Sequence, residues 1–351
     1  MNNIESKIRS YSRSFPVKFV KALDSSMFDE NSKEYIDFFT GAGTMNYGHN
    51  NYDVNQAMIE YINSNNILHS LDLQTKAKDD FLKKFHKYIL KPRSLNHKVQ
   101  FVAPSGANGV EAAIKIARKA KKRRGIISFT NSFHGMSLGA LSVTGNSYYK
   151  NEFISSNSDV SFCLYDKYLG GKIDTSDILD QLLRDKTSGT DMPAAIILET
   201  IQADGGVNVA SIEWLQKINN ICKDNDILLI VDDVQVGCGR SGDFFSFERA
   251  NIIPDLIIIS KAIGGGMPLS ILLTDEKIDK HWKIGEHTGT FRGNNLAFIA
   301  GKKVLEYWKD ENFSKNIKRK GKIIHRTLSN FAKKNKKIIE VRGIGLIYGI
   351  E

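Results

Sequence analysis

Residues 226–268 begin with Asp-Ile-Leu-Leu-Ile-Val-Asp-Asp-Val-Gln-Val-Gly-Cys-Gly-Arg-Ser-Gly and end with Pro-Asp-Leu-Ile-Ile-Ile-Ser-Lys-Ala-Ile-Gly-Gly-Gly-Met-Pro. Two apolar runs in this stretch, Ile227–Val231 and Leu256–Ile259, have the length and β-branched content of buried parallel strands. Asp232 follows the first run, and Lys261 follows the second. Because ligands of open α/β sheets bind beyond the carboxyl ends of the strands, this acid and this amine are predicted to face one pocket.

An acid and an amine at two strand ends have a specific chemical use. A lysine can form a Schiff base with a carbonyl cofactor, and pyridoxal phosphate needs both that lysine and a carboxylate against its pyridine nitrogen. The carboxylate keeps the nitrogen protonated, because a nearby opposite charge favours the charged form. Taken singly, Asp232 could cap a loop and Lys261 could be a solvated strand end. The three glycines at 264–266, Pro268 and the glycine-rich turn after Asp232 together favour the cofactor site.

The motif around these two residues resembles that of a known family. It comprises Asp232-Asp233-Val234-Gln235, the glycines Gly237, Gly239 and Gly242, Arg240, and Ser260-Lys261 before the triple glycine. This combination is similar to the class III aminotransferases, which are pyridoxal-phosphate enzymes of fold type I. The resemblance extends from about Ser12 to Glu351. It implies an α/β fold with a mostly parallel sheet between two layers of helices, plus a smaller α+β domain.

The resemblance also predicts how the chain divides into domains. Residues 1–47 would form the N-terminal segment of the small domain, residues 48–311 the large cofactor-binding domain, and residues 312–351 the beginning of the C-terminal small domain. Residues 343–351 resemble the start of a strand segment that is internal in family members, so a C-terminal truncation is expected. Along the large domain, apolar runs alternate with helical patterns, which is typical of a parallel sheet with crossover helices.

Hydrophobic periodicity and turn residues predict the main elements. Strands are expected at residues 99–102, 126–129, 194–198 and 269–274, helices at 53–64, 75–90, 211–224 and 294–307, and a hairpin at 27–29 and 34–38. Residues 150–175 are polar and irregular, and their pattern predicts no particular element.

The composition is that of an ordinary globular chain. Its 351 residues are 41% hydrophobic and 25% charged, and a chain of this length readily buries a core. No apolar run approaches the roughly 20 residues that span a bilayer, and the N-terminus lacks the apolar stretch of a signal peptide. We therefore expect a cytoplasmic protein without a membrane segment. Three scattered cysteines without C-x-x-C spacing indicate neither a disulfide framework nor a metal site.

The net charge of +10 makes nucleic acid a partner to consider. Lysine and arginine residues cluster at 119–124 and 315–322, both on predicted helix surfaces. No aromatic residues alternate with the first cluster, as a base-stacking platform requires. We interpret both clusters as solvated helix faces and expect no nucleic-acid partner.

The predicted strand at 99–102 leads through Pro-Ser-Gly-Ala-Asn-Gly at 104–109 into a helix. A glycine-rich turn at a helix N-terminus offers free N–H groups and a favourable dipole to a phosphate. The pattern alone is common in α/β proteins. By resemblance, this turn holds the cofactor phosphate through Ser105, Gly106 and Ala107.

Five further positions are assigned roles around the cofactor ring by resemblance. Phe133, in a Phe-His-Gly sequence after a predicted strand, would lie flat on one face of the ring, with Val234 on the other face. Gln235 would hydrogen-bond the ring oxygen. His134 is counted among the cofactor contacts, although a buried structural histidine fits the same pattern. Glu199 is expected to pair with a substrate-site arginine, and the alternative is an acidic strand end that faces solvent.

Three glycines within residues 40–48 suggest a loop packed close to a ligand or to neighbouring backbone. The resemblance favours an active-site loop, with Gly41 and Ala42 near the substrate. Thr290 matches a family threonine that reaches the phosphate of the other subunit, so we expect a homodimer or a higher homo-oligomer. Arg292 is a further candidate for substrate binding.

The sequence Phe-Arg-Gly-Asn-Asn at 291–295 resembles the diaminobutyrate–2-oxoglutarate aminotransferases of ectoine synthesis. Residues 13–16 and 41–43 resemble the same branch, whereas residues 264–268 follow the general class. The implied reaction transfers the amino group of L-glutamate to L-aspartate 4-semialdehyde. The alternatives are a class III enzyme acting on ornithine, acetylornithine or 4-aminobutyrate, an aminomutase, and a pyridoxal-phosphate-binding protein without turnover.

Overall fold

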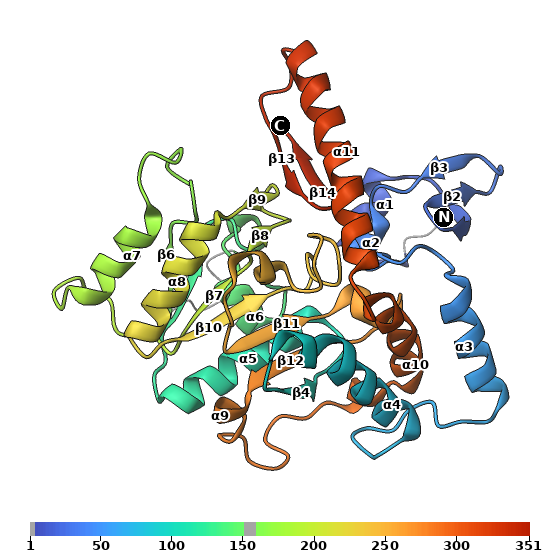
Figure 1. Cartoon of the computed structure of the whole chain (residues 1–351), viewed down its shortest axis with the longest axis horizontal. Helices are drawn as coiled ribbons and strands as arrows, with labels where there is room; N and C mark the ends of the chain where they lie inside the picture. The colour runs from blue at the N-terminus through green and yellow to red at the C-terminus, as the bar shows by residue number, and fades with distance from the viewer. Residues whose placement is uncertain (1–3, 151–158) are drawn as a thin grey trace.

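A seven-stranded sheet lies at the centre of the computed structural model, which describes residues 4–150 and 159–351 (Figure 1). The strand order is β4-β12-β11-β10-β7-β5-β6. The strands are β4 (His97–Phe101), β5 (Ile126–Phe129), β6 (Val160–Cys163), β7 (Ala195–Leu198), β10 (Leu228–Asp232), β11 (Leu256–Ile259) and β12 (Ile271–Asp275). This arrangement confirms the predicted α/β architecture.

The two strands that decide the site, β10 and β11, are parallel neighbours. Asp232 pairs in register with Ile258, and Lys261 follows that partner by three residues. Asp232 and Lys261 therefore lie at the same carboxyl edge of the sheet, as the sequence predicts. β12 runs antiparallel to both β11 and β4. Its orientation follows from the short connection at 260–270, because a parallel return needs a longer crossover.

The central strands are buried on both faces, and alternate residues belong to different cores. In β10, Leu228 and Ile230 pack with the helices of one face, whereas Leu229 and Val231 pack with those of the other. Burial on both faces explains the uninterrupted apolar runs in the sequence. The first face is covered by α5 (Gly106–Lys121) and α6 (Leu138–Val143), and the second by α4 (Lys76–Phe85), α8 (Ile212–Asp224) and α10 (Asn295–Val304).

Smaller elements surround the sheet. An N-terminal antiparallel sheet contains β1 (Phe19–Leu23), β2 (Ser26–Asp29) and β3 (Glu34–Ile36), and short strands β8 (Ile201–Gln202) and β9 (Asn208–Val209) pair near the carboxyl edge. At the other end of the chain, the long helix α11 (Asn312–Lys334) runs beside a hairpin of β13 (Val341–Ile344) and β14 (Ile347–Ile350) (Figure 1). The remaining α-helices are α1 (Tyr11–Ser14), α3 (Tyr52–Asn63), α7 (Thr175–Arg184) and α9 (Glu276–Asp279), and α2 (Thr40–Gly43) is a short turn with left-handed backbone angles.

Single turns of 3-10 or π-helix complete the structure. They are η1 (His86–Leu90), η2 (Lys91–Arg93), η3 (Ser147–Tyr149), η4 (Ser246–Ala250), η5 (Lys261–Gly264), η6 (Thr290–Gly293) and η7 (Leu305–Trp308). Of these, η1 is the π-helical turn. It continues α4, so the helix predicted at 75–90 changes its hydrogen-bonding pattern near its end. None of the helices in residues 4–150 and 159–351 has the length and hydropathy of a membrane-spanning segment.

One strand of the central sheet, β6, was not predicted from the sequence. β6 lies at the edge of the sheet within residues 150–175, where no element is predicted, and it pairs only with β5 among the described strands. Two of its four residues, Ser161 and Phe162, are exposed. An edge strand this short and half-solvated lacks the apolar run by which the central strands are recognised.

Candidate active site

Asp232 and Lys261 line one cavity of about 120 Å³ at the carboxyl edge of the sheet. Most of the residues assigned to cofactor binding line the same cavity, namely Gly106, Ala107, Phe133, His134, Glu199, Val234 and Gln235. These residues come from the ends of β5, β7, β10 and β11 and from the start of α5. The fold thus brings together groups that are more than 150 residues apart in the chain.

The Asp232 carboxylate is held by two donors. Its Oδ2 atom lies 2.8 Å from Nδ1 of His134, and its Oδ1 atom accepts the backbone N–H of Val234 at 3.1 Å. Both the acid and the histidine are buried, and Nε2 of His134 has no hydrogen-bond partner within the described residues. The histidine therefore orients the acid from within the protein.

The Lys261 amine points to a specific acceptor. Its Nζ donates a hydrogen bond to Oε1 of Gln235 at 2.6 Å. The backbone of Lys261 has φ +49, a left-handed conformation that is uncommon for a residue with a side chain and is often found at functional sites. Burial lowers the pKa of the Lys261 ammonium, and the neighbouring carboxylate of Asp232 opposes this effect most strongly. A lowered pKa favours the neutral amine, which is the nucleophilic form.

The N-terminus of α5 closes one side of the cavity. Ser105 is the N-cap residue, and its hydroxyl accepts the N–H of Asn108 at 3.4 Å and donates to Oδ1 of the same side chain at 2.8 Å. Gly106 packs so tightly that an added Cβ would lie 2.9 Å from Cγ1 of Val234. The first turn of the helix thus abuts the residue expected under the ring. Ser105 itself is exposed and does not line the cavity.

Phe133 and Glu199 are linked directly. The backbone N–H of Phe133 donates to Oε2 of Glu199 at 3.0 Å. Burial raises the pKa of Glu199 well above its ordinary value, and the charge of Asp232 adds to this rise. Within residues 4–150 and 159–351, no arginine hydrogen-bonds Glu199. The expected pairing of Glu199 with an arginine therefore stays a prediction, while the alternative of a solvent-facing acid is wrong because Glu199 is buried.

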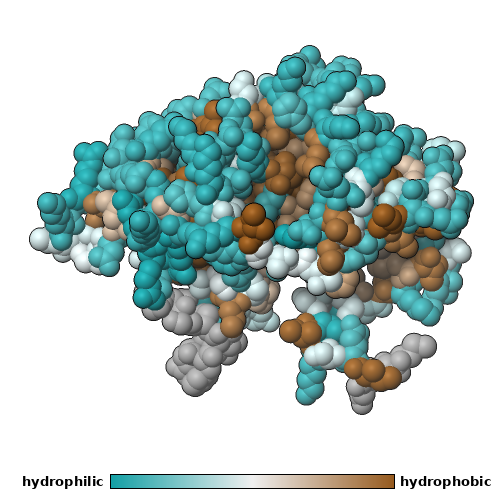
Figure 2. All heavy atoms as spheres, turned by 90° about the horizontal axis from the view of Figure 1, so that it is seen from below, coloured by the Kyte–Doolittle hydropathy of each residue, from teal (hydrophilic) through white to brown (hydrophobic). Residues whose placement is uncertain are grey.

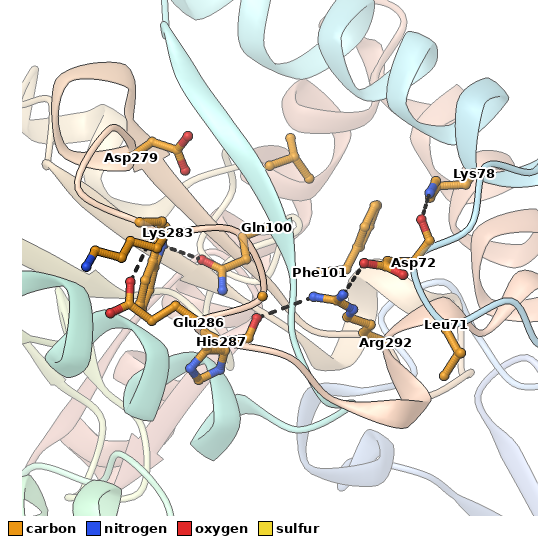
Figure 3. Close-up of a pocket in the computed structure, with 13 residues that line it drawn as sticks. Leu71, Asp72, Lys78, Gln100, Phe101, Asp279, Lys283, Glu286, His287 and Arg292 are labelled. Atoms are coloured by element: carbon orange, nitrogen blue, oxygen red, sulfur yellow. Dashed lines mark hydrogen bonds and ion pairs between the residues drawn. The ribbon is translucent and has the colours of Figure 1, made fainter.

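Arg292 and Thr290 also lie outside this cavity. Arg292 lines a second cavity of about 300 Å³, where its guanidinium contacts Asp72 and donates to the backbone O of His287 (Figure 3). Thr290 belongs to the same segment, and its carbonyl oxygen lies 2.7 Å from Nε2 of His69. Within one chain, neither residue lines the Lys261 cavity. Their assignments to substrate and to the partner's phosphate remain predictions.

The glycine loop approaches the cavity through a residue that was not assigned. Gly41 and Ala42 do not line the cavity. Gly43, however, would place a Cβ 3.2 Å from the backbone O of Gln235 and 3.5 Å from its Cγ. Sequence reasoning also missed Gly135, Ile201 and Val236, which line the cavity. Val236 continues the predicted motif and could have been included, whereas nothing in the sequence around Ile201 indicates a ligand.

The assembled groups fit pyridoxal phosphate. A buried carboxylate stands where a ring nitrogen needs an anion, a half-buried amine stands where a Schiff base would form, and a helix N-terminus lies beside both. Phe133 and Val234 supply two apolar surfaces at the same cavity. By contrast, no group of three or more His, Cys, Asp or Glu residues that could hold a metal ion is found among the described residues.

The comparisons with known proteins agree with this chemistry. The family model of the aminotransferases of class III matches residues 8–351. A diaminobutyrate–2-oxoglutarate transaminase from Wolinella succinogenes is 51% identical over 349 residues, which cover 99% of this chain and 82% of the relative. An uncharacterized aminotransferase from Sinorhizobium fredii is also 51% identical, over 99% of this chain and 78% of the relative.

Solved structures resemble the whole chain. The taurine:2-oxoglutarate aminotransferase from Bifidobacterium kashiwanohense, in complex with PLP and glutamate, has a TM-score of 0.88 and 24% identity, and the match covers 100% of this chain and 79% of that one. An S-selective transaminase from Bacillus megaterium has a TM-score of 0.89 at 24% identity, over 99% of this chain and 80% of that one. At this identity, the likeness shows the fold.

Proposed function

This chain belongs to the class III aminotransferases, and from that membership we propose that it transfers the amino group of L-glutamate to L-aspartate 4-semialdehyde. The products are 2-oxoglutarate and L-2,4-diaminobutyrate, the first step of ectoine synthesis. The observation that carries the choice of acceptor is the identity of about half of all residues to the diaminobutyrate transaminase of Wolinella succinogenes. As a class III aminotransferase, the protein is a pyridoxal-phosphate-dependent enzyme.

The residues that line the cavity have different roles in the proposed reaction. When bound, pyridoxal phosphate supplies the carbonyl that Lys261 captures and the ring that takes up electrons from the substrate carbon. Asp232, oriented by His134, would hold the proton on the ring nitrogen. Lys261 Nζ would accept and return the proton moved in the reaction, and its lowered pKa suits it to that exchange. Gln235 Oε1, which accepts from Lys261, keeps the amine directed into the cavity.

The remaining contacts hold and orient the cofactor. Ser105, Gly106 and Ala107, at the start of α5, would bind the phosphate through the Ser105 hydroxyl and the free N–H groups of the helix start. Phe133 and Val234, which both line the cavity, would enclose the ring from two sides. Burial raises the pKa of the Glu199 carboxyl well above its ordinary value, which favours its protonated form.

The proposal includes a homodimer in which Thr290 reaches the partner's phosphate. Large apolar side chains are exposed on α3, on the loop that follows it and on η6, which contains Thr290, namely Ile59, Ile62, Ile67, Leu68, Leu71, Leu73 and Phe291. Apolar areas are also visible between the hydrophilic ones on the face shown in Figure 2. Exposed apolar patches of this kind mark interaction surfaces. A partner seated there would cover them and bring the Thr290 segment to its neighbour's site.

An acceptor screen tests the proposed reaction. Purified protein with bound cofactor is given L-glutamate and, in parallel, L-aspartate 4-semialdehyde, the aldehyde derived from ornithine, its acetylated form, and succinate semialdehyde. Formation of 2-oxoglutarate is followed in each case. The highest kcat/KM is expected with aspartate 4-semialdehyde, and an Asp232→Asn variant serves as the inactive control. A higher kcat/KM with another aldehyde would replace the acceptor, and no 2-oxoglutarate with any of them would refute transamination from glutamate.

A further inference from the structure

The backbone of Thr40–Gly43 forms a left-handed turn that requires support. The φ values of Thr40, Gly41, Ala42 and Gly43 are +52, +55, +53 and +90. Glycine adopts this region freely, but side chains disfavour it, and a β-branched threonine disfavours it most. Two residues of the four therefore hold an unfavourable conformation. Conformations of this kind persist only where surrounding contacts impose them.

The contacts that impose it come from two charged side chains. Oδ1 of Asp37 accepts the N–H groups of Phe39 and Thr40, each at 2.8 Å. The guanidinium of Arg240 donates through Nη2 to Oγ1 of Thr40 at 3.0 Å and also contacts Oδ1 of Asn46. One planar cation thus contacts both the turn and Asn46, three residues after it. This fork geometry is particular to arginine.

Arg240 also joins the turn to the C-terminal hairpin. Its Nη1 donates to the backbone O of Leu346 at 3.3 Å, and its own backbone O accepts the N–H of Leu346 at 2.8 Å. Burial lowers the pKa of Arg240, and the charge of Asp37 opposes this effect. The guanidinium is therefore a largely desolvated cation between the N-terminal segment, the glycine-rich turn and the hairpin of β13 and β14. Hydrogen bonds to a charged group gain strength in such surroundings.

The supported turn rests against the group that holds Lys261. Gly43 packs on the backbone and on Cγ of Gln235, and Oε1 of Gln235 accepts from Lys261. Gln235 and Arg240 lie at opposite ends of one short turn of the chain. Asn46 adds a third attachment, because its Nδ2 donates to the backbone O of Cys238 at 3.2 Å. The glycine loop is thus held at both ends against the turn that follows Asp232.

From this geometry we propose that Arg240 is a positioning residue for the glycine loop. By holding Thr40–Gly43 in its left-handed conformation against Gln235, Arg240 sets the shape of the substrate side of the Lys261 cavity. Arg240 does not touch the cavity itself, so cofactor attachment at Lys261 proceeds without it. The expected effect of Arg240 on substrate binding rests on the proposed function, but its effect on the conformation of Thr40–Gly43 does not.

Hydrogen exchange of the cofactor-loaded protein tests the positioning role. In Arg240→Met, amide exchange in the peptide covering residues 38–47 is expected to quicken roughly tenfold or more, with exchange in β10 unchanged. Arg240→Lys should lie between Arg240→Met and the wild type, because one ammonium cannot serve Thr40, Asn46 and Leu346 together. The matched control is Arg319→Met, since Arg319 is an exposed arginine that bonds Asn316 on its own helix. Unchanged exchange at 38–47 in Arg240→Met would overturn the proposal.

Two further measurements separate positioning from a general structural role. Borohydride reduction should fix cofactor to Lys261 as completely in Arg240→Met as in the wild type, while KM for glutamate rises about tenfold and kcat changes much less. Loss of cofactor together with faster exchange throughout the chain would show that Arg240 only maintains the fold. If the wild-type chain transaminates no acceptor, the proposed function fails, while the exchange and labelling results still decide the role of Arg240.

Substitutions of Thr40, alone and combined with Arg240→Met, test whether the Arg240–Thr40 hydrogen bond supports the loop. Thr40→Val keeps the shape of the side chain and removes the hydroxyl that Arg240 Nη2 reaches at 3.0 Å. Faster exchange at 38–47 is expected in Thr40→Val, whereas Thr40→Ser retains the wild-type rate. The double variant with Arg240→Met should be little faster than Arg240→Met alone, because residues that share an interaction are not additive. Full additivity would show that the Arg240–Thr40 bond does not support the loop.

Discussion

Nδ1 of His134 lies 2.8 Å from Oδ2 of Asp232, and both side chains are buried while lining the Lys261 cavity. A carboxylate oriented in this way cannot turn away from the ring nitrogen that it is proposed to hold. Asp232→Asn retains the shape but removes the charge, so the ring loses its proton and its capacity to take up electrons. We expect the half-reaction with glutamate to slow roughly 10³-fold or more, at about 1.4 kcal/mol per decade.

Stopped-flow measurement of that half-reaction checks the prediction. His134→Ala should cause a smaller loss, because it frees Asp232 without removing its charge. Equal rates in the wild type and in Asp232→Asn would contradict the role of the acid, and an undiminished rate in His134→Ala would contradict the orienting role of the histidine.

Lys261 is expected to be the residue that attaches the cofactor. Borohydride reduction followed by peptide mapping should label Lys261, and Lys261→Ala should lose both the label and turnover by orders of magnitude while remaining folded. Lys150→Ala is a matched control, because Lys150 is also a lysine whose pKa is lowered by burial, yet it does not line the cavity. A label on any lysine other than Lys261 would refute the assignment.

Thr290 tests the contribution of a second subunit. If its segment reaches the partner's phosphate, Thr290→Ala should lower cofactor retention after dialysis by roughly tenfold, the effect of losing about one hydrogen bond to a charged group. A variant with Ile59 and Ile62 changed to Asp should sediment as a monomer and lose the cofactor, because both exposed isoleucines belong to the proposed contact surface. A stable monomer that keeps its cofactor through dialysis would be inconsistent with this arrangement.

Asp233 makes the stability of the protein depend on pH. Burial raises its pKa to about 7 from an ordinary 3.8, and its Oδ2 accepts the N–H of Ser246 at 3.0 Å. Between these two pH values, the folded protein retains a proton that the unfolded chain releases. The free energy of unfolding therefore falls as pH rises from 3.8 towards 7. The total change is on the order of a few kcal/mol, at about 1.36 kcal/mol per pKa unit.

Urea unfolding at about pH 5 and about pH 8 measures this dependence. Asp233→Asn cannot titrate, so its loss of stability between the two pH values should be smaller than that of the wild type. Asp191→Asn, at an exposed position, should behave as the wild type does. An identical loss in Asp233→Asn and the wild type would show that another group is responsible.

Much of this site could be predicted from the sequence, because its reactive residues directly follow apolar runs that indicate buried strands. A run of apolar, β-branched residues indicates a buried strand. The polar residue that follows such a run lies at the carboxyl edge of the sheet, where ligands bind. Asp232 and Lys261 were found in this way, and the family motif supplied Gly106, Phe133 and Gln235, all of which line the same cavity.

The two strand ends, with their acid and amine, can be recognised in the chain alone, because burial on both faces of a parallel sheet requires an uninterrupted apolar run. Which distant groups meet depends on how the elements pack in three dimensions. The tertiary structure places His134 on Asp232, Gly43 on Gln235, and Arg292 in a cavity apart from Lys261. Such contacts depend on how separate elements pack. A hydrogen bond between residues almost a hundred positions apart leaves no periodicity in the chain that joins them.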